Sequence, residues 1–239
     1  MPINHPNVIY LKQYQLIDNF TIHEYKKILP EMYKYNELTK TKIDEMKMKL
    51  NLPENYDSIF IRRGDKLAVE SMFIETKKFI DLLLARNPNC HTIFLQTDDY
   101  NCYIDLQKYI SDNNLNIRAV TLCDENIRGG MIIFKENVEN FLKKAEINLD
   151  YISENMTNYE NCKPVNCMNS EEIYKHTIDM IIGIDIVLNS NSCVCDYQSN
   201  VSRFIKLLHK NFDSVVDILN PDLEIDMNRS ECPAFGNFI

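Results

Sequence analysis

The chain has 239 residues, of which 45% are hydrophobic and 26% charged, and its formal net charge at pH 7 is −9. This length corresponds to one or at most two domains, and the composition is normal for a globular protein with a sizeable core. The negative charge argues against a general nucleic-acid or anionic-membrane binder, because those surfaces demand an excess of Lys and Arg. The frequent Asn and Ile residues are typical of an AT-rich genome, such as that of a parasite or a large DNA virus.

Several functional signatures are absent from the sequence. The five glycines match neither G-x-G-x-x-G nor the P-loop pattern. No apolar run reaches the ~20 residues of a membrane-spanning helix, and the N-terminus lacks the pattern of a secretory signal. The missing signal and the ordinary core composition predict that the eight cysteines are reduced thiols in a cytoplasmic chain. No C-x-x-C pair occurs, so structural zinc is the minor alternative.

The first 35 residues mix strand and helix patterns, and a regular order of elements begins after them. Apolar periodicity then predicts alternating helices and strands. In chain order these are a helix over 39–52, a strand over 58–61, a helix over 73–86, a strand over 92–96, a helix over 101–111 and a strand over 116–122. Thr39 or Thr41 would cap the first helix, and Pro53 ends it.

Residues 123–170 are the least regular part of the chain, and they include a charged helix predicted over 135–145. A helix over 171–188, a strand over 192–195 and a helix over 199–209 follow. Strands that alternate with helices of this length predict an α/β fold, a Rossmann-like mostly parallel sheet with helices on both faces.

This pattern divides the chain into three parts. Residues 1–37 form an N-terminal extension that packs on the core, and 221–239 form a C-terminal tail. The Rossmann-like domain spans 38–220 and contains the irregular insertion 123–170, which is a candidate acceptor region.

Polar segments directly follow three of the predicted strands. RRGDK (62–66) follows the first strand, TDD (97–99) the second, and DYQSN (196–200) the last. In a parallel sheet the carboxyl ends of the strands meet at one edge, where ligands bind. We therefore expect these three segments to share one site.

The segment 62–66 has the charges of an anion site. Arg62 and Arg63 each present a planar fork that matches phosphate oxygens, and Lys66 adds a point charge. Asp65 can hold one of these cations in orientation, and Glu70 is a candidate general base. The alternative is a solvated loop of mixed charge, which the position after a buried strand disfavours.

The other two segments allow structural as well as functional interpretations. Asp98 and Asp99 can hold a ribose, bind a divalent metal or cap the next helix, and metal is the minor option because adjacent side chains diverge. Ser199 and Asn200 stand where a helix begins, and the free N–H groups there favour a phosphate. Simple capping by Ser199 is an equal alternative.

Together the three segments resemble a known enzyme family. IFIRRGDKLAVESMF is similar to the R-R-x-D-K-x-x-x-E segment of α1,6-fucosyltransferases and bacterial nodulation fucosyltransferases. TIFLQTDDY resembles the strand followed by T-D-D in that family, and CVCDYQSNVSRFIKLLH resembles its strand followed by a [ST]-x-x-S-[NQ]-V-x-R helix start. The resemblance covers roughly 38–210, the nucleotide-sugar half of a GT-B-like fold.

The resemblance implies an inverting, metal-independent transfer of fucose from GDP-fucose to a glycan hydroxyl. By motif position, Glu70 would be the base, Lys66 would be coupled to it, and Arg62 would contact the diphosphate. The implied donor-binding residues are Arg62, Arg63, Asp65, Thr97, Asp98, Asp99, Asp179, Gln198, Ser199 and Asn200. No metal or cofactor is implied besides the donor substrate.

The chain departs from the family at three places. Phe60 stands where the family has a His. The family's guanine-binding Asp falls at Gly183 by ungapped counting, and we prefer Asp179, one turn earlier on the same helix face, to Asp185 on another face. The family's acceptor domain is largely absent, so an acceptor site must come from 1–37, from 123–170 or from a partner chain.

Two alternatives stay open. The same fold could use another nucleotide-sugar donor, or the chain could be a non-catalytic nucleotide-binding half of a larger assembly. The expected partners are a nucleotide sugar and a glycan or glycoprotein acceptor, with a homo-oligomer as an option. Asn200 begins an N-x-S sequon whose glycosylation would block the donor pocket. This favours the cytoplasm, as in a virus or microbe that builds its own glycans.

Overall fold

A computed structural model describes residues 22–64, 67, 72–130 and 165–222, with the side chains of 22–25 and 166 left aside. Residue contacts divide the chain into two compact units, Tyr35–Pro221 and a second unit of Met1–Lys34 with Asp222–Ile239. In the second unit, the described part is mainly helix α2 (Ile22–Met32). The fold described below is that of the larger unit.

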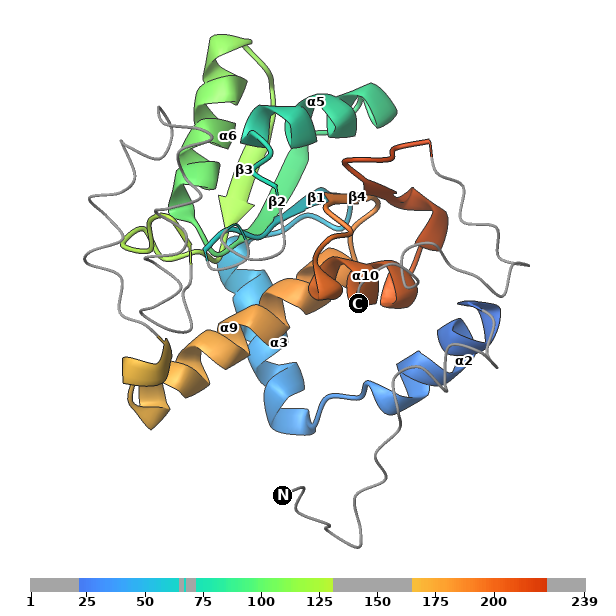
Figure 1. The fold of residues 1–239 in the computed structure, drawn as a ribbon, viewed down its shortest axis with the longest axis vertical. Helices are drawn as coiled ribbons and strands as arrows, with labels where there is room; N and C mark the ends of the chain where they lie inside the picture. Colours follow the sequence, from blue (N-terminus) through green and yellow to red (C-terminus); the bar gives the residue numbers. More distant parts are fainter. Residues whose placement is uncertain (1–21, 65–66, 68–71, 131–164, 223–239) are drawn as a thin grey trace, which may run out of the picture. The chain divides into compact units, whose positions relative to one another are not determined.

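The larger unit is built on a five-stranded parallel sheet (Figure 1). Its strands are β1 (Asp57–Ile61), β2 (Thr92–Thr97), β3 (Arg118–Thr121), β4 (Cys193–Cys195) and β5 (Val215–Asp217). The strand order is β3-β2-β1-β4-β5, and every neighbouring pair is parallel. The order reverses between β1 and β4, which is the topological switch point of a Rossmann-like sheet. The predicted fold class is confirmed.

Helices cover both faces of this sheet (Figure 1). Helices α5 (Thr76–Arg86) and α6 (Tyr100–Asp112) pack on one face, where Phe79, Ile80 and Leu106 are fully buried against inward-facing side chains of β1 and β2. Helices α3 (Glu37–Leu50), α9 (Ser170–Leu188) and α10 (Asn200–Leu208) lie on the other face. Two short 3-10 turns, η2 (Val165–Cys167) and η3 (Phe212–Ser214), complete the described elements.

The predicted helices and strands form close to their expected bounds, with three differences. The cap of α3 is Asn36, whose side chain accepts from the Thr39 amide, and not Thr39 or Thr41. Helix α5 begins at Thr76, because the backbone carbonyl of Ile74 is used by the buried Arg63 side chain instead. Strand β5 was not predicted, since this short segment becomes a strand by pairing with β4.

Two further expectations concern the insertion and membranes. The helix predicted over 135–145 lies outside the described residues. Among the helices that the structure describes, none combines the length and apolarity needed to cross a bilayer.

Candidate functional site

A cavity of about 400 Å³ opens at the carboxyl ends of the strands. Residues from the ends of β1, β2 and β3, from α9 and from the start of α10 surround it. These include Phe60, Arg62, Gln96, Thr97, Asp98, Leu122, Cys123, Asp124, Ile127, Met168, Lys175, His176, Asp179, Met180, Ser199 and Asn200. The three polar segments therefore meet at one site, as their positions after the strands predicted.

Arg62 is held at this cavity by Asp98. Its Nη1 atom lies 3.1 Å from Asp98 Oδ2. The other carboxylate oxygen, Oδ1, accepts a hydrogen bond of 2.7 Å from the Arg63 backbone amide. One carboxylate after β2 thus fixes both the backbone and the guanidinium that follow β1. A guanidinium carries a positive charge and five N–H donors, which is the chemistry that binds an anion.

Arg63 lies away from the cavity. Its side chain is 2% exposed, and Nη2 donates to the Ile74 carbonyl oxygen at 2.6 Å. The guanidinium carbon also lies 4.5 Å from the centre of the Phe73 ring. The expectation that two adjacent arginines face one anion is therefore corrected: Arg62 lines the cavity, and Arg63 anchors the segment before α5.

Asp99 is also buried behind the site rather than lining it. It is 1% exposed, and its Oδ1 accepts from the backbone amides of Asn101 at 3.0 Å and Gly129 at 2.8 Å. Burial raises the pKa of this carboxyl above its ordinary value. Asp99 is thus the N-cap of α6, the structural alternative considered above, and only Thr97 and Asp98 of this segment line the cavity.

Two glycines connect the loops after β1 and β3. The Gly64 amide donates to the Gly129 carbonyl oxygen at 3.2 Å. Gly130 has φ +94°, and a Cβ atom there would lie 2.2 Å from the Gly64 nitrogen. Only glycine permits this backbone conformation and this close approach. The Arg62 loop is therefore supported from behind by the Gly129–Gly130 turn.

The start of α10 forms another wall of the cavity. Ser199 is its N-cap residue and is 3% exposed, but its side chain makes no capping hydrogen bond. Backbone N–H groups in the first turn of a helix have no intrahelical acceptor, and they favour an anion. Gln198 does not line the cavity, because its Oε1 accepts from the Met72 amide at 3.1 Å.

Helix α9 brings Asp179 to the cavity and leaves Asp185 outside it. Asp179 lies 2.9 Å from Lys175 Nζ, one turn earlier on the helix. Asp185 pairs with Lys47 of α3 at 2.7 Å. Of the two carboxylates weighed for binding a base, the structure thus places Asp179 at the site.

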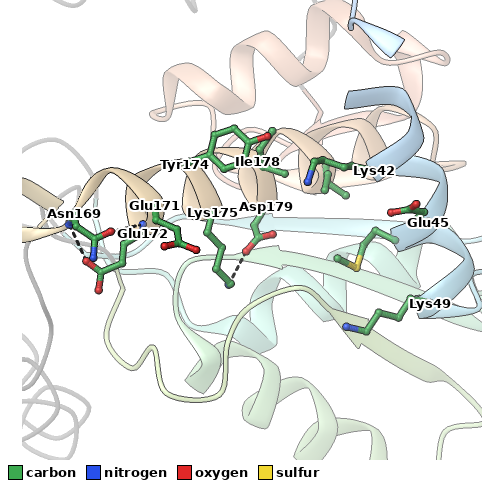
Figure 2. A pocket seen from close by; sticks show the side chains of 12 residues that line it. Lys42, Glu45, Lys49, Asn169, Glu171, Glu172, Tyr174, Lys175, Ile178 and Asp179 are labelled. Carbon is green, nitrogen blue, oxygen red and sulfur yellow. Dashed lines mark hydrogen bonds and ion pairs between the residues drawn. The ribbon is translucent and has the colours of Figure 1, made fainter. Parts of the chain in front are cut away.

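A second cavity, of about 620 Å³, lies between α3 and α9 (Figure 2). Lys42 and Lys49 of α3 and Glu171 and Tyr174 of α9 are among its lining residues. Lys175 and Asp179 line both cavities. Figure 2 shows the ion pair between these two side chains on the face of α9.

Sequence reasoning did not single out several residues of the first cavity, notably Gln96, Cys123 and His176. Burial, together with the nearby carboxylates of Asp98 and Asp99, raises the pKa of the Cys123 thiol far above its ordinary value. Cys123 is thus protonated at neutral pH and a poor nucleophile. Gln96 could have been noticed as an uncharged polar side chain within the apolar strand TIFLQT.

Three candidate residues, Asp65, Lys66 and Glu70, lie outside the described residues. Within the described part of the chain, no group of three or more His, Cys, Asp and Glu side chains could hold a metal ion.

No protein-family model matches the sequence, and no curated protein matches it.

Proposed function

We propose that this protein is an inverting, metal-independent glycosyltransferase that moves fucose from GDP-fucose to a glycan hydroxyl. The observation that carries the proposal is the placement of Arg62 and the start of α10 around one cavity at the switch point of the sheet. Doubly wound sheets bind nucleotides at this point.

The cavity supports a nucleoside diphosphate ligand in two ways. Arg62 and the backbone N–H groups of α10 provide positive charge and hydrogen-bond donors for phosphate oxygens. Leu122, Ile127 and Met180 provide apolar surface on which a base can pack. A nucleotide sugar has a charged diphosphate and a flat base, which match the cationic part and the apolar part of this cavity.

The proposed reaction requires a base and a stabilised leaving group. Glu70 would remove the proton from the acceptor hydroxyl, and the oxygen would attack C1 of fucose from the face opposite the diphosphate. The bond from C1 to the diphosphate oxygen would break, and GDP would leave with the electron pair. Fixed cations such as Arg62 stabilise the charge that grows on this leaving group. Lys66 would hold Glu70 in position.

A different nucleotide-sugar donor is the second candidate. Asp179 carries the proposed contact to guanine, but it is already paired with Lys175, and Gly183 has no side chain to replace it. A cytoplasmic location, a viral or microbial origin and a partner chain that completes the acceptor site belong to the same proposal and rest on the sequence alone.

Turnover of GDP-fucose tests the proposal. We expect the wild-type protein to release GDP from GDP-fucose, faster with a suitable glycan acceptor. The Glu70→Gln variant should lose this turnover by about 100-fold or more, since general-base catalysis contributes about 10²–10⁴-fold, while it still binds GDP. The matched control is Glu54→Gln, which changes an exposed glutamate before β1. A Glu70→Gln variant with full turnover, or wild type that turns over no nucleotide sugar, would overturn the proposal.

A further inference from the structure

Gln96 is one of the residues that line the first cavity. It is the penultimate residue of β2, and its register partner on β1 is Phe60, which also lines the cavity. A Cβ atom built on Gly183 would lie 1.9 Å from Gln96 Oε1. The Gln96 amide therefore lies against Gly183 of α9, where a side chain at position 183 would otherwise lie.

The amide of Gln96 makes no hydrogen bond to any residue that the structure describes. Its Oε1 atom is buried and has no partner there. Gln96 Nε2 forms none of the described hydrogen bonds either. Gln96 as a whole is half-buried, but its acceptor oxygen is fully enclosed. Leaving a buried acceptor oxygen unpaired is unfavourable. Buried polar groups in proteins are nearly always paired.

A ligand in this cavity would supply the missing partner. The last torsion of a glutamine side chain is broad, so rotation can turn either the oxygen or the nitrogen toward the cavity. An amide pairs side by side with any group that presents a donor next to an acceptor, as the edges of nucleobases do. Phosphates are expected elsewhere in the cavity, beside Arg62 and the start of α10.

We infer that Gln96 is a specificity-determining residue that hydrogen-bonds the base of the nucleotide bound in the first cavity. This inference rests on the proposed function, since it takes a nucleoside diphosphate as the ligand. It assigns to β2 a contact with the base that adds to the one proposed for Asp179 on α9.

Calorimetry with two probes tests this inference. GDP carries both base and phosphates, whereas inorganic pyrophosphate carries phosphates alone. The Gln96→Met variant keeps the length of the side chain and removes its hydrogen-bonding groups. We expect it to bind GDP about tenfold more weakly or worse, and to bind pyrophosphate like wild type. Gln107→Met, at an exposed position on α6, is the matched control and should bind both probes like wild type.

Thermal unfolding separates this role from a structural one. Removing a buried oxygen that has no partner among the described residues should leave the melting temperature of Gln96→Met unchanged or raise it. Gln96→Ala is the second variant, because its small side chain cannot overpack against Gly183, and the same loss of GDP binding is expected. Unchanged GDP binding in either folded variant, or an equal loss for both probes, would overturn the inference. Wild type that binds no GDP would overturn the proposed function and, with it, this inference.

Discussion

Arg62 and Asp98 illustrate how two residues from different strands build one feature of the site. Asp98 accepts from the Arg63 amide and pairs with the Arg62 guanidinium, so the side chain that faces the cavity is already oriented. Arg63 leaves the site because its guanidinium is used by Ile74 on the other side of the loop. The sequence could not distinguish the two arginines, since the loop geometry that separates them depends on partners distant in the chain.

A second pair of side chains resembles a catalytic pair but has a structural role. His209 Nε2 lies 3.1 Å from Ser190 Oγ, and its Nδ1 lies 2.8 Å from the Asn211 carbonyl oxygen. Ser190 is fully buried, and its hydroxyl donates to the Val187 carbonyl oxygen. No substrate can reach this hydroxyl in the folded protein, so the pair belongs to the core.

Burial lowers the pKa of His209 to about 4, below the ordinary value of about 6.5 for a histidine. Above about pH 6.5 the imidazole is neutral in both folded and unfolded chains. As the pH falls from about 6.5 to about 4, the unfolded chain binds a proton that the folded chain does not, so the folded state loses stability.

The free energy of unfolding should therefore depend on pH through His209. We expect a loss of about 2 kcal/mol between pH 7.5 and pH 5 from this group alone. Urea unfolding at the two pH values measures the difference. The His209→Gln variant should lose about that much of the pH dependence, whereas His91→Gln, at an exposed position, should retain it. Equal pH dependence in all three proteins would contradict the assignment.

At the level of helices and loops, the order of elements was largely predictable from the sequence. The alternation of apolar strands with amphipathic helices is a strong local signal, and every strand from β1 to β4 was anticipated. The start of α5 and the existence of β5 were missed, because the first depends on the buried Arg63 side chain and the second on pairing with β4. Tertiary contacts therefore determine where α5 begins and whether β5 forms.

The Gly129–Gly130 turn shows how one loop supports another. Its backbone touches Gly64, so the loop that carries Arg62 depends on a turn after β3. In the sequence the two glycines fall within the irregular region 123–170. Nothing local in the sequence predicts that their backbone packs against residues more than sixty positions earlier.

Replacing Gly130 by Ala should disturb both stability and the site. The positive φ is strained for alanine, and the new methyl group would overlap the Gly64 backbone. We expect a loss of more than about 2 kcal/mol in the free energy of unfolding, measured with urea. Glu125→Ala, an exposed change in the same loop, is the control and should unfold like wild type. A Gly130→Ala protein as stable as wild type would show that the two loops do not depend on this contact.

For the chain as a whole, the sheet topology accounts for the location of the site. The strand order places β1 beside both β2 and β4, so the segments that follow these three strands converge on one cavity. This convergence was predictable from the position of polar segments after apolar strands. The identity of individual lining residues was not, as Gln96 shows, because it depends on how α9 crosses the sheet.

Binding of GDP in the presence of EDTA is the measurement that tests the central claim most directly. We expect calorimetry to show that wild type binds GDP without metal. Arg62→Ala should bind it about 10- to 100-fold more weakly, since a charge-assisted hydrogen bond contributes about 1.5–3 kcal/mol. Arg118→Ala removes an arginine at the amino end of β3, on the opposite edge of the sheet, and should bind like wild type. Absence of GDP binding by wild type, or unchanged binding by Arg62→Ala, would contradict the account.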